Sequence, residues 1–263
     1  MNLVQKYMIG KSTTKLVNSL ALKKYRTKEN CFLIEGDKMV KEALDSDLKI
    51  KLLIVTDQFL NRFPIAQTDA ERIIETDAKE LKKASLLQHP QNGLAVCEIP
   101  EKSKFPDSLP EGLSIFLDGI QDPGNMGTIV RICDWYGIQH VFCSPDSVDL
   151  YNPKVIQASM GSFHRIQLHE CDFEALAGLA EKAEAPVFGA FMNGDNIYQT
   201  QLPQQAILVM GNEGKGIRPA VEKQITNKLS IPNFSENEIK AESLNVSVAT
   251  AILCSEFKRA YSK

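Results

Sequence analysis

The sequence predicts an α/β protein made of two successive units, the second of which is built on a parallel β-sheet. Short apolar runs rich in β-branched residues alternate along the chain with segments whose apolar residues recur at helical spacing. A segment with three prolines, 100–112, separates a shorter first part from a longer second part. The 263 residues are 43% hydrophobic and 24% charged, which is typical of a protein with a substantial core. We therefore expect domains at 1–99 and 113–263, joined by a linker at 100–112.

The first unit reads as a small α/β domain. The run "CFLIE" at 31–35 is apolar and predicts a strand, and the segment that follows it, 36–46, has apolar residues at helical spacing. The other elements expected here are a strand at 50–56, a helix near 57–63, a helix at 77–88 and a strand at 93–99.

The second unit continues the alternation with longer helices. The expected strands are 113–118, 140–144, 164–168, 186–191, 206–210 and 228–232, and the expected helices are 125–137, 152–160, 172–184, 218–226 and 243–260. Apolar strands that alternate with helices indicate a parallel sheet covered on both faces. In such sheets ligands bind beyond the carboxyl ends of the strands, so the strand-to-helix loops are the first place to look for a site.

The charge is unevenly distributed along the chain. The net charge is −3, yet residues 1–28 contain no acid and seven basic residues: Lys6, Lys11, Lys15, Lys23, Lys24, Arg26 and Lys28. A run of one sign is either a solvated face or a surface that contacts phosphate groups, because clustered Lys and Arg gain affinity by releasing counterions. Both interpretations stay open at this point.

Several classes of protein lack support in the sequence. The six cysteines form no CxxC pair and no histidines have HExxH spacing, so we expect no metal, and small buried thiols in a reducing compartment. No stretch approaches the length of about 18 apolar residues that a membrane span needs, and the N-terminal segment has no continuous apolar run. We therefore expect a cytoplasmic protein with no membrane partner.

Three polar stretches lie in or beside the expected strand-to-helix loops: "DGIQDPGNMGTIVR" (118–131), "VMGNEGKGI" (209–217) and "IPNFSENEIKAESLNVSVA" (231–249). The first lacks the glycine spacing of a dinucleotide-binding loop, and the second has Gly216 where a phosphate-binding loop needs Ser or Thr. A serine-hydrolase GxSxG pattern is absent as well. Their Asn, Ser, Glu and Arg side chains suit positioning and group transfer better than covalent catalysis.

Each of these features has a simpler interpretation when taken alone. "DPGN" is a common turn sequence, and Arg131 could be an ion-paired residue on a helix surface. Ser243 and Asn245 could be N-terminal caps of the last helix. Only the combination and order of the three stretches favour a site.

Together, the three stretches resemble the three motifs of the SpoU/TrmH family of RNA ribose 2′-O-methyltransferases, in the SPOUT superfamily. The segment "QASMGSFHRI" (157–166) is similar to the middle segment of that family. "FLIEGDKMVKEAL" (32–44) resembles the small substrate-binding domain that precedes the catalytic domain in some members. The resemblance implies a parallel-sheet domain with a deep trefoil knot, an exception to the rule that folded chains are unknotted. It also implies a homodimer that binds S-adenosylmethionine and modifies structured RNA, with ribosomal RNA favoured over transfer RNA.

The resemblance assigns roles to individual residues. The catalytic residues that it implies are Asn125, Arg131, Glu213, Ser243 and Asn245. The residues that it implies for the cofactor are Met210, Gly211, Ile231 and Leu244, largely through backbone atoms. The basic segment then supplies candidate RNA contacts, namely Lys11, Lys23, Lys24 and Arg26.

Two details of the implied site need comment. Arg131 either removes the proton of the ribose hydroxyl or fixes an RNA phosphate, and we favour the second role because a guanidinium stays protonated. Asn233 stands where family members usually have Met, and we expect this difference to affect cofactor affinity and not the reaction class. Two alternatives remain: an RNA-binding protein that keeps the fold without activity, and a SPOUT enzyme that methylates a base. The five intact catalytic positions argue against the first, and "SLNVS" favours ribose chemistry over the second.

Overall fold

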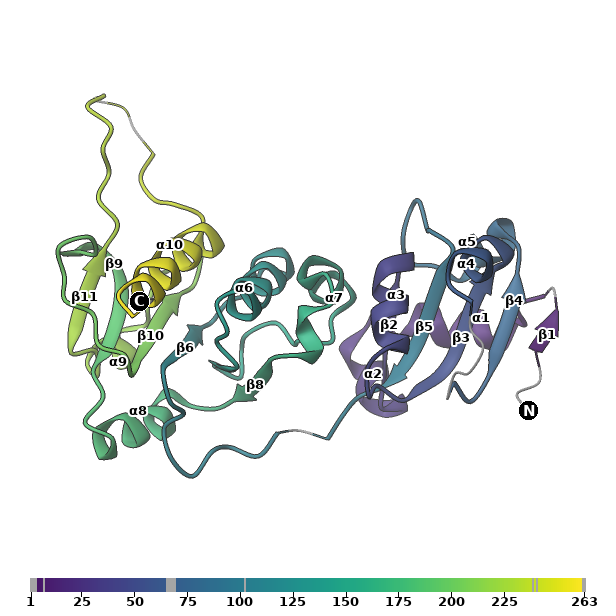
Figure 1. Cartoon of the computed structure of the whole chain (residues 1–263), viewed down its shortest axis with the longest axis horizontal. Coiled ribbons are helices and arrows are strands. Elements are labelled where there is room, and N and C mark those ends of the chain that lie inside the picture. The colour runs from purple at the N-terminus through teal and green to yellow at the C-terminus, as the bar shows by residue number, and fades with distance from the viewer. Residues whose placement is uncertain are drawn as a thin grey trace. The chain divides into compact units, whose positions relative to one another are not determined.

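The computed structural model describes residues 4–6, 8–64, 70–101, 103–237, 239 and 241–261 (Figure 1). Its internal contacts divide the chain into two compact units, Met1–Glu101 with Tyr151–Gly161, and Lys102–Leu150 with Ser162–Lys263. The segment Tyr151–Gly161 thus packs with the first unit although it lies between two strands of the second in the sequence. The boundaries predicted from the sequence, with domains at 1–99 and 113–263, remain a proposal.

The first unit contains a mixed sheet in the order β1-β4-β3-β5-β2. Its strands are β1 (Val4–Lys6), β2 (Cys31–Glu35), β3 (Ile50–Thr56), β4 (Ile73–Thr76) and β5 (Gly93–Glu98). Strand β5 pairs antiparallel with both β2 and β3, whereas β4 pairs parallel with β3 and β1. Every residue of β2 is buried, as the apolar run 31–34 predicts, and the buried Glu35 carboxylate accepts hydrogen bonds from Ser85 and Leu86.

Six helices accompany this sheet within the described residues: α1 (Lys11–Ser19), α2 (Lys23–Glu29), α3 (Asp37–Leu44), α4 (Asp57–Arg62), α5 (Ala78–Ala84) and α7 (Pro153–Ser159). Thr56 caps α4 and Asp77 caps α5 with side-chain oxygens, which satisfies backbone donors at both helix starts. Helix α7 packs against β2, where the rings of Tyr151 and Phe32 lie 4.8 Å apart. Strands β1 and β4 and helices α1 and α2 were not among the predicted elements.

The second unit contains a six-stranded sheet in which every pair is parallel, in the order β11-β9-β10-β6-β7-β8. Its strands are β6 (Leu113–Asp118), β7 (His140–Cys143), β8 (Gln167–Glu170), β9 (Val187–Asn196), β10 (Ala206–Gly211) and β11 (Asn227–Ser230). Strand β6 is fully buried and lies between β10 and β7. The predicted α/β fold class with a parallel sheet is confirmed; the knot remains a prediction.

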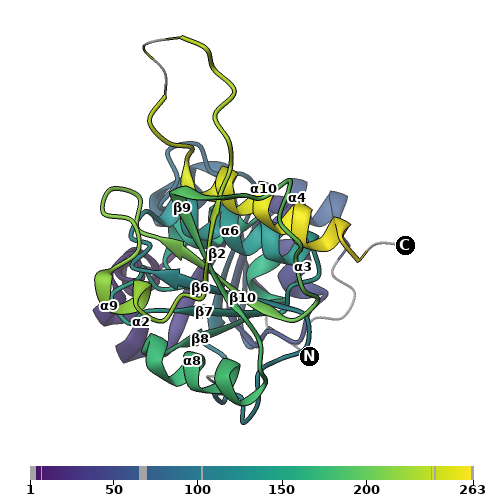
Figure 2. The ribbon, with the colours of Figure 1, turned by 90° about the vertical axis from the view of Figure 1, so that its left-hand side faces the viewer.

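Helices cover both faces of this sheet. They are α6 (Pro123–Trp135), a short 3-10 helix at Ser162–His164, α8 (Phe173–Lys182), α9 (Pro219–Glu222) and α10 (Val246–Arg259). Figure 2 shows α6 and α10 on one side and α8 on the other, and α6 and α10 pack against each other. On the α8 side, Phe173 and Leu176 join Phe116 and Phe142 in one buried cluster. The core therefore lies on both faces of the sheet and leaves the strand ends to the loops.

The predicted strand at 164–168 is wrong in position. Residues 162–164 form the 3-10 helix, and the strand begins only at Gln167. Asp134 accepts hydrogen bonds from Ser162 Oγ (2.7 Å) and Arg165 Nε (2.9 Å), and these contacts hold the turn that precedes the strand. This contact joins residues from distant parts of the chain, so local periodicity could not reveal it.

Neither a membrane-spanning helix nor a metal cluster occurs in the described part of the chain. None of the helices there is both long and apolar enough to cross a bilayer. No group of three or more His, Cys, Asp or Glu residues there is arranged to hold a metal ion.

Candidate active site

The site begins where β6 and β10 end side by side. The two strands pair in register from Leu113↔Ala206 to Asp118↔Gly211, so the segments that follow them leave the sheet at the same edge. Here the chain passes from β6 into α6 and from β10 toward α9. The first two polar stretches of the sequence therefore meet, as expected for the carboxyl ends of parallel strands.

Groups at the start of α6 form hydrogen bonds with Glu213, which lies in the loop after β10. Asp122 is the N-cap of α6, and its Oδ1 accepts a hydrogen bond from the backbone N–H of Asn125 at 2.8 Å. Pro123 occupies the first turn, where its missing N–H costs nothing. The Glu213 Oε1 atom accepts from Asn125 Nδ2 at 3.0 Å and from the Asp122 N–H at 3.3 Å. A carboxylate at this place is also favoured by the positive end of the helix dipole.

The third polar stretch reaches the same point through Asn245. This residue is the N-cap of α10: its Oδ1 accepts from the N–H of Ser247 (2.9 Å) and from Ser247 Oγ (2.6 Å). Its Nδ2 donates to Asn125 Oδ1 at 2.9 Å. Glu213, Asn125 and Asn245 thus form one hydrogen-bonded chain that joins all three stretches. The capping interpretation of Asn245 is confirmed, and the same amide also contacts Asn125 because it has a donor end and an acceptor end; its catalytic role stays a prediction.

Arg131 and Ser243 are not part of this hydrogen-bonded chain. Arg131 lies further along α6 and is exposed, and its guanidinium has no hydrogen bond or ion pair with another described side chain or carbonyl. Ser243 and Leu244 are exposed just before α10 begins, with Leu244 at 48%. An exposed guanidinium at this position is available to a phosphate group of a ligand.

The residues implied for the cofactor differ in what they can offer. Met210 is 2% exposed, so its side chain belongs to the core and only its backbone can face a ligand. Gly211 starts a hairpin in which Asn212 and Gly216 exchange backbone hydrogen bonds of 3.0 and 2.9 Å. A Cβ atom at Gly211 would lie 2.4 Å from backbone atoms of Gly216 and Ile217, so only glycine allows this close approach. Ile231 is half-buried directly after β11.

Sequence reasoning missed Asp118 and Arg218. The structure joins them through hydrogen bonds from the backbone N–H and Nε of Arg218 to the Asp118 carboxylate, at 2.7 and 2.6 Å. The available signal was a carboxylate at the end of the otherwise apolar run "LSIFLD", which the sequence predicts to be buried. A buried carboxylate requires a partner, and the sequence did not say which residue supplies it.

The basic segment at the N-terminus divides into exposed and buried charges. Lys11, Lys23 and Lys24 are exposed on α1 and α2. Arg26 is only 2% exposed, and its Nη1 donates to the carbonyls of Leu20 (2.7 Å) and Ala21 (3.0 Å). The predicted RNA contact of Arg26 does not fit this placement, because its guanidinium satisfies carbonyls that follow α1.

The two functions of Asn245 can be separated by substitution. We expect Asn245→Ala to lower the free energy of unfolding by about 1 kcal/mol, since it removes the N-cap of α10. Asn245→Ser keeps a capping oxygen but is too short to reach Asn125, so its stability should stay within about 0.5 kcal/mol of the wild type. Urea unfolding of both variants measures the difference. Equal losses for Ser and Ala would contradict the capping role.

Comparisons with known proteins agree with this architecture. Residues 112–255 match the SpoU rRNA Methylase family, and residues 11–95 match the MRM3-like substrate binding domain. The chain is 32% identical over 237 residues to the 23S rRNA (guanosine(2553)-2′-O)-methyltransferase RlmP of Bacillus subtilis, an alignment that covers 89% of this chain and 91% of that protein.

Solved structures give the same result. A putative RNA methyltransferase of the TrmH family from Porphyromonas gingivalis has a TM-score of 0.83 and 39% identity, covering 96% of this chain and 99% of its own. An AdoMet-bound rRNA methyltransferase from Sinorhizobium meliloti has a TM-score of 0.83 and 25% identity, with 99% of each chain covered. The family predicted from the three motifs is therefore confirmed: the chain belongs to the SpoU rRNA methylase family.

Proposed function

We propose that this chain transfers a methyl group from S-adenosylmethionine to a ribose 2′-hydroxyl in ribosomal RNA. The observation that carries the proposal is the Glu213–Asn125–Asn245 chain of hydrogen bonds, which joins three loops at the carboxyl edge of a parallel sheet. Similarity to a 23S rRNA 2′-O-methyltransferase over nine-tenths of the chain supports the reaction and the substrate class. Similarity to an AdoMet-bound structure supports the cofactor.

The residues present fit an adenosyl cofactor. Gly211 admits no side chain, because the backbone of Gly216 and Ile217 fills that space, and it is itself half-buried at the end of β10. Ile231 and Leu244 offer aliphatic surface that suits an adenine ring better than a phosphate group. Residues 210–211, 231 and 244 would hold the cofactor, chiefly through backbone atoms. When bound, it supplies an electrophilic methyl group.

The work of the protein is then orientation and proton removal. A ribose hydroxyl is a weak nucleophile, and it must approach the methyl carbon in line while it loses its proton. Arg131 carries an exposed cation and would fix an RNA phosphate beside the hydroxyl, where its charge lowers the hydroxyl pKa. Asn125 holds the Glu213 carboxylate and is itself held by Asn245. Ser243, from the same loop as Asn245, would position the RNA.

We further propose that the working form is a homodimer with a trefoil knot in the second unit, and that the protein acts in the cytoplasm. The chain after the edge strand β11 returns to α10, which packs beside α6 and β10 in the middle of the sheet, as such a knot requires. The second unit exposes large apolar side chains that an association between two copies could remove from water: Trp135 (85%), Met192 (72%), Phe234 (78%) and Ile239 (93%).

The reaction is tested with purified protein, labelled S-adenosylmethionine and deproteinised ribosomal RNA. We expect label in the RNA, and nuclease digestion with mass spectrometry should place it on ribose and not on a base. Transfer RNA serves as the competing substrate. A folded protein that binds the cofactor by calorimetry and labels neither RNA would support a non-catalytic RNA-binding role, and label on a base would contradict the ribose assignment.

The dimer is tested by sedimentation equilibrium. The chain mass is 29.3 kDa, and we expect a species of about twice that mass at micromolar concentration, because dimerisation would remove exposed apolar side chains from water. A monomer across the whole concentration range would contradict the proposal. Adding S-adenosylmethionine shows whether the cofactor strengthens the association.

Arg131→Ala should slow methyl transfer by roughly 10²-fold or more, the scale for loss of a positioned catalytic group. The affinity for S-adenosylmethionine should stay the same, since the cofactor residues lie on other loops. Arg259→Ala is a matched control, because Arg259 is an exposed arginine whose guanidinium pairs with Glu256 on the same helix. Single-turnover kinetics and calorimetry measure the two quantities. Near-normal turnover would remove Arg131 from the mechanism, and weakened cofactor binding would reassign it.

The lysines of α1 and α2 should contribute to RNA affinity. A triple variant with Gln at positions 11, 23 and 24 should bind RNA more weakly than the wild type. The slope of log K against log salt concentration should become shallower by about 0.7–0.9 for each lost phosphate contact. Arg26 is not substituted in this variant, because its side chain is buried. Lys38, Lys79 and Lys82, also exposed in the first unit, form the control set when changed to Gln. Identical salt slopes for both variants would mean that the α1–α2 lysines are only a solvated face.

A further inference from the structure

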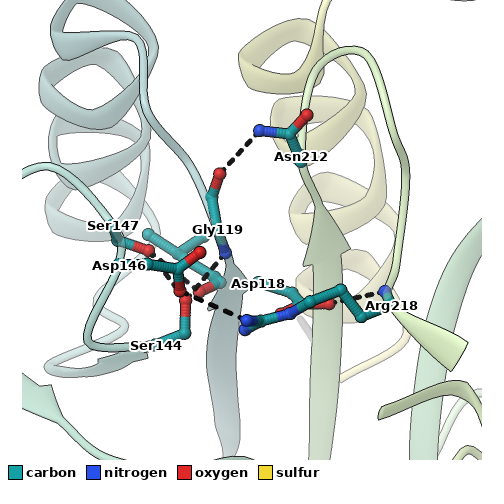
Figure 3. A network of polar contacts seen from close by, with 8 residues as sticks. Asp118, Gly119, Ser144, Asp146, Ser147, Asn212 and Arg218 are labelled. Atoms are coloured by element: carbon teal, nitrogen blue, oxygen red, sulfur yellow. Dashed lines mark hydrogen bonds and ion pairs between the residues drawn. The ribbon is translucent and has the colours of Figure 1, made fainter. Parts of the chain in front are cut away.

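Asp118 is a fully buried carboxylate at the carboxyl end of the central strand β6. Figure 3 shows it facing Arg218, which comes from the loop after β10. The Asp118 Oδ2 atom accepts the backbone N–H of Arg218 at 2.7 Å, and Oδ1 accepts Nε at 2.6 Å and also pairs with Nη2. One carboxylate is thus bound by three donors of a single residue, which satisfies its charge without water.

Arg218 has a fixed place in the loop that carries Glu213. It is the N-cap residue of α9 and follows directly after the Asn212–Gly216 hairpin. Its Nη1 also pairs with Asp146 at 3.3 Å. The hydrogen bond with Asp118 raises the pKa of Arg218 above its ordinary value. Its side chain remains 47% exposed, so the ionic contact lies at the boundary between core and solvent.

The residue after Asp118 is held on both sides. The Gly119 N–H donates to Ser144 Oγ at 2.8 Å, and its carbonyl accepts from Asn212 Nδ2 at 2.7 Å (Figure 3). Gly119 has a φ of +71°, a conformation that L side chains rarely adopt. Residues 118–119 are therefore the point at which the loops after β6, β7 and β10 are bound together.

We propose that Arg218 is a positioning residue for methyl transfer, and that its pair with Asp118 sets the place of Glu213 relative to Asn125. The hairpin that carries Glu213 has one end in β10 and the other end at Arg218. Without the Asp118 contact the loop keeps the β10 end, the Asn212–Gly119 contact, the buried side chain of Ile217 and the hydrogen bonds of Glu213 itself, but loses its charged contact to the end of β6. The carboxylate of Glu213 would then lose its fixed distance from Asn125 and from the start of α6. This inference rests on the proposed methyltransferase function.

Arg218→Lys is the informative substitution. A lysine keeps a positive charge near the buried carboxylate, so the fold is retained, but it cannot present the guanidinium fork. We expect KM for S-adenosylmethionine to rise about tenfold or kcat to fall about tenfold, because small misplacements of site groups are costly. The KM for RNA and the melting temperature should change no more than in the control variant Arg165→Lys.

Arg165→Lys is the matched control. Arg165 binds the carboxylate of Asp134 through Nε and Nη2 at 2.9 Å each, as Arg218 binds Asp118, and its side chain is 43% exposed. Its pair has no contact with Asn125 or Glu213 in the described hydrogen bonds. A purely structural role of the Arg218 pair predicts equal kinetic losses in the two variants, and that outcome would overturn the inference.

A double-mutant cycle with Glu213→Gln completes the test. If Arg218 acts through the loop that carries Glu213, both substitutions damage the same step. The double variant should then transfer methyl groups only slightly more slowly than Glu213→Gln alone. If the reduction in kcat/KM of the double variant equals the product of the two single reductions, the positioning role is overturned. A wild-type protein that binds the cofactor but transfers no methyl group would instead refute the proposed function, so the two failures are distinguishable.

Discussion

The site depends on the in-register pairing of β10 with β6 in the middle of the parallel sheet. Six residue pairs, ending at Asp118↔Gly211, bring two chain segments to the same edge. Their side chains are buried from Leu113 to Asp118 and from Ala206 to Met210, so a shift of one residue would turn core side chains to the wrong face. Hydrophobic burial therefore fixes the register, and the register fixes where the polar loops meet.

Short polar side chains at this edge cap helices and also contact the residues of the neighbouring loops. Asp122 caps α6 and Asn245 caps α10, and each cap directs the first turn of its helix toward Glu213 or Asn125. Helix starts are suitable places for such residues because their backbone N–H groups need acceptors. The geometry of the site is thus set by the same contacts that start the two helices.

The first unit shows how a charged segment is divided by folding. Lys11, Lys23 and Lys24 remain on the surface, whereas Arg26 turns inward to two carbonyls at the end of α1. Arginine suits this position because its several donors can satisfy more than one carbonyl. The remaining lysines form a smaller basic surface than the sequence suggested, in a unit that matches a substrate-binding domain.

The sequence by itself determined the elements and residues whose signals are local. The buried strands β6 and β10, the parallel α/β class and the three polar stretches with Asn125, Glu213 and Asn245 all follow from patterns within about 20 neighbouring residues. The family resemblance added the meaning of the order of those stretches and the roles expected of Asn125, Glu213 and Asn245, which no single pattern contains.

Only the tertiary structure decided the features that depend on distant contacts. Strands β1 and β4 are three and four residues long and are stabilised by pairing in the sheet, so their short sequences carry little signal of their own. Asp134 fixes the start of β8 from 28 and 31 residues away, through Ser162 and Arg165. Asp118 and Arg218 are 100 residues apart. The cost of burying a charge makes some partner necessary, but only the folded chain selects which residue provides it.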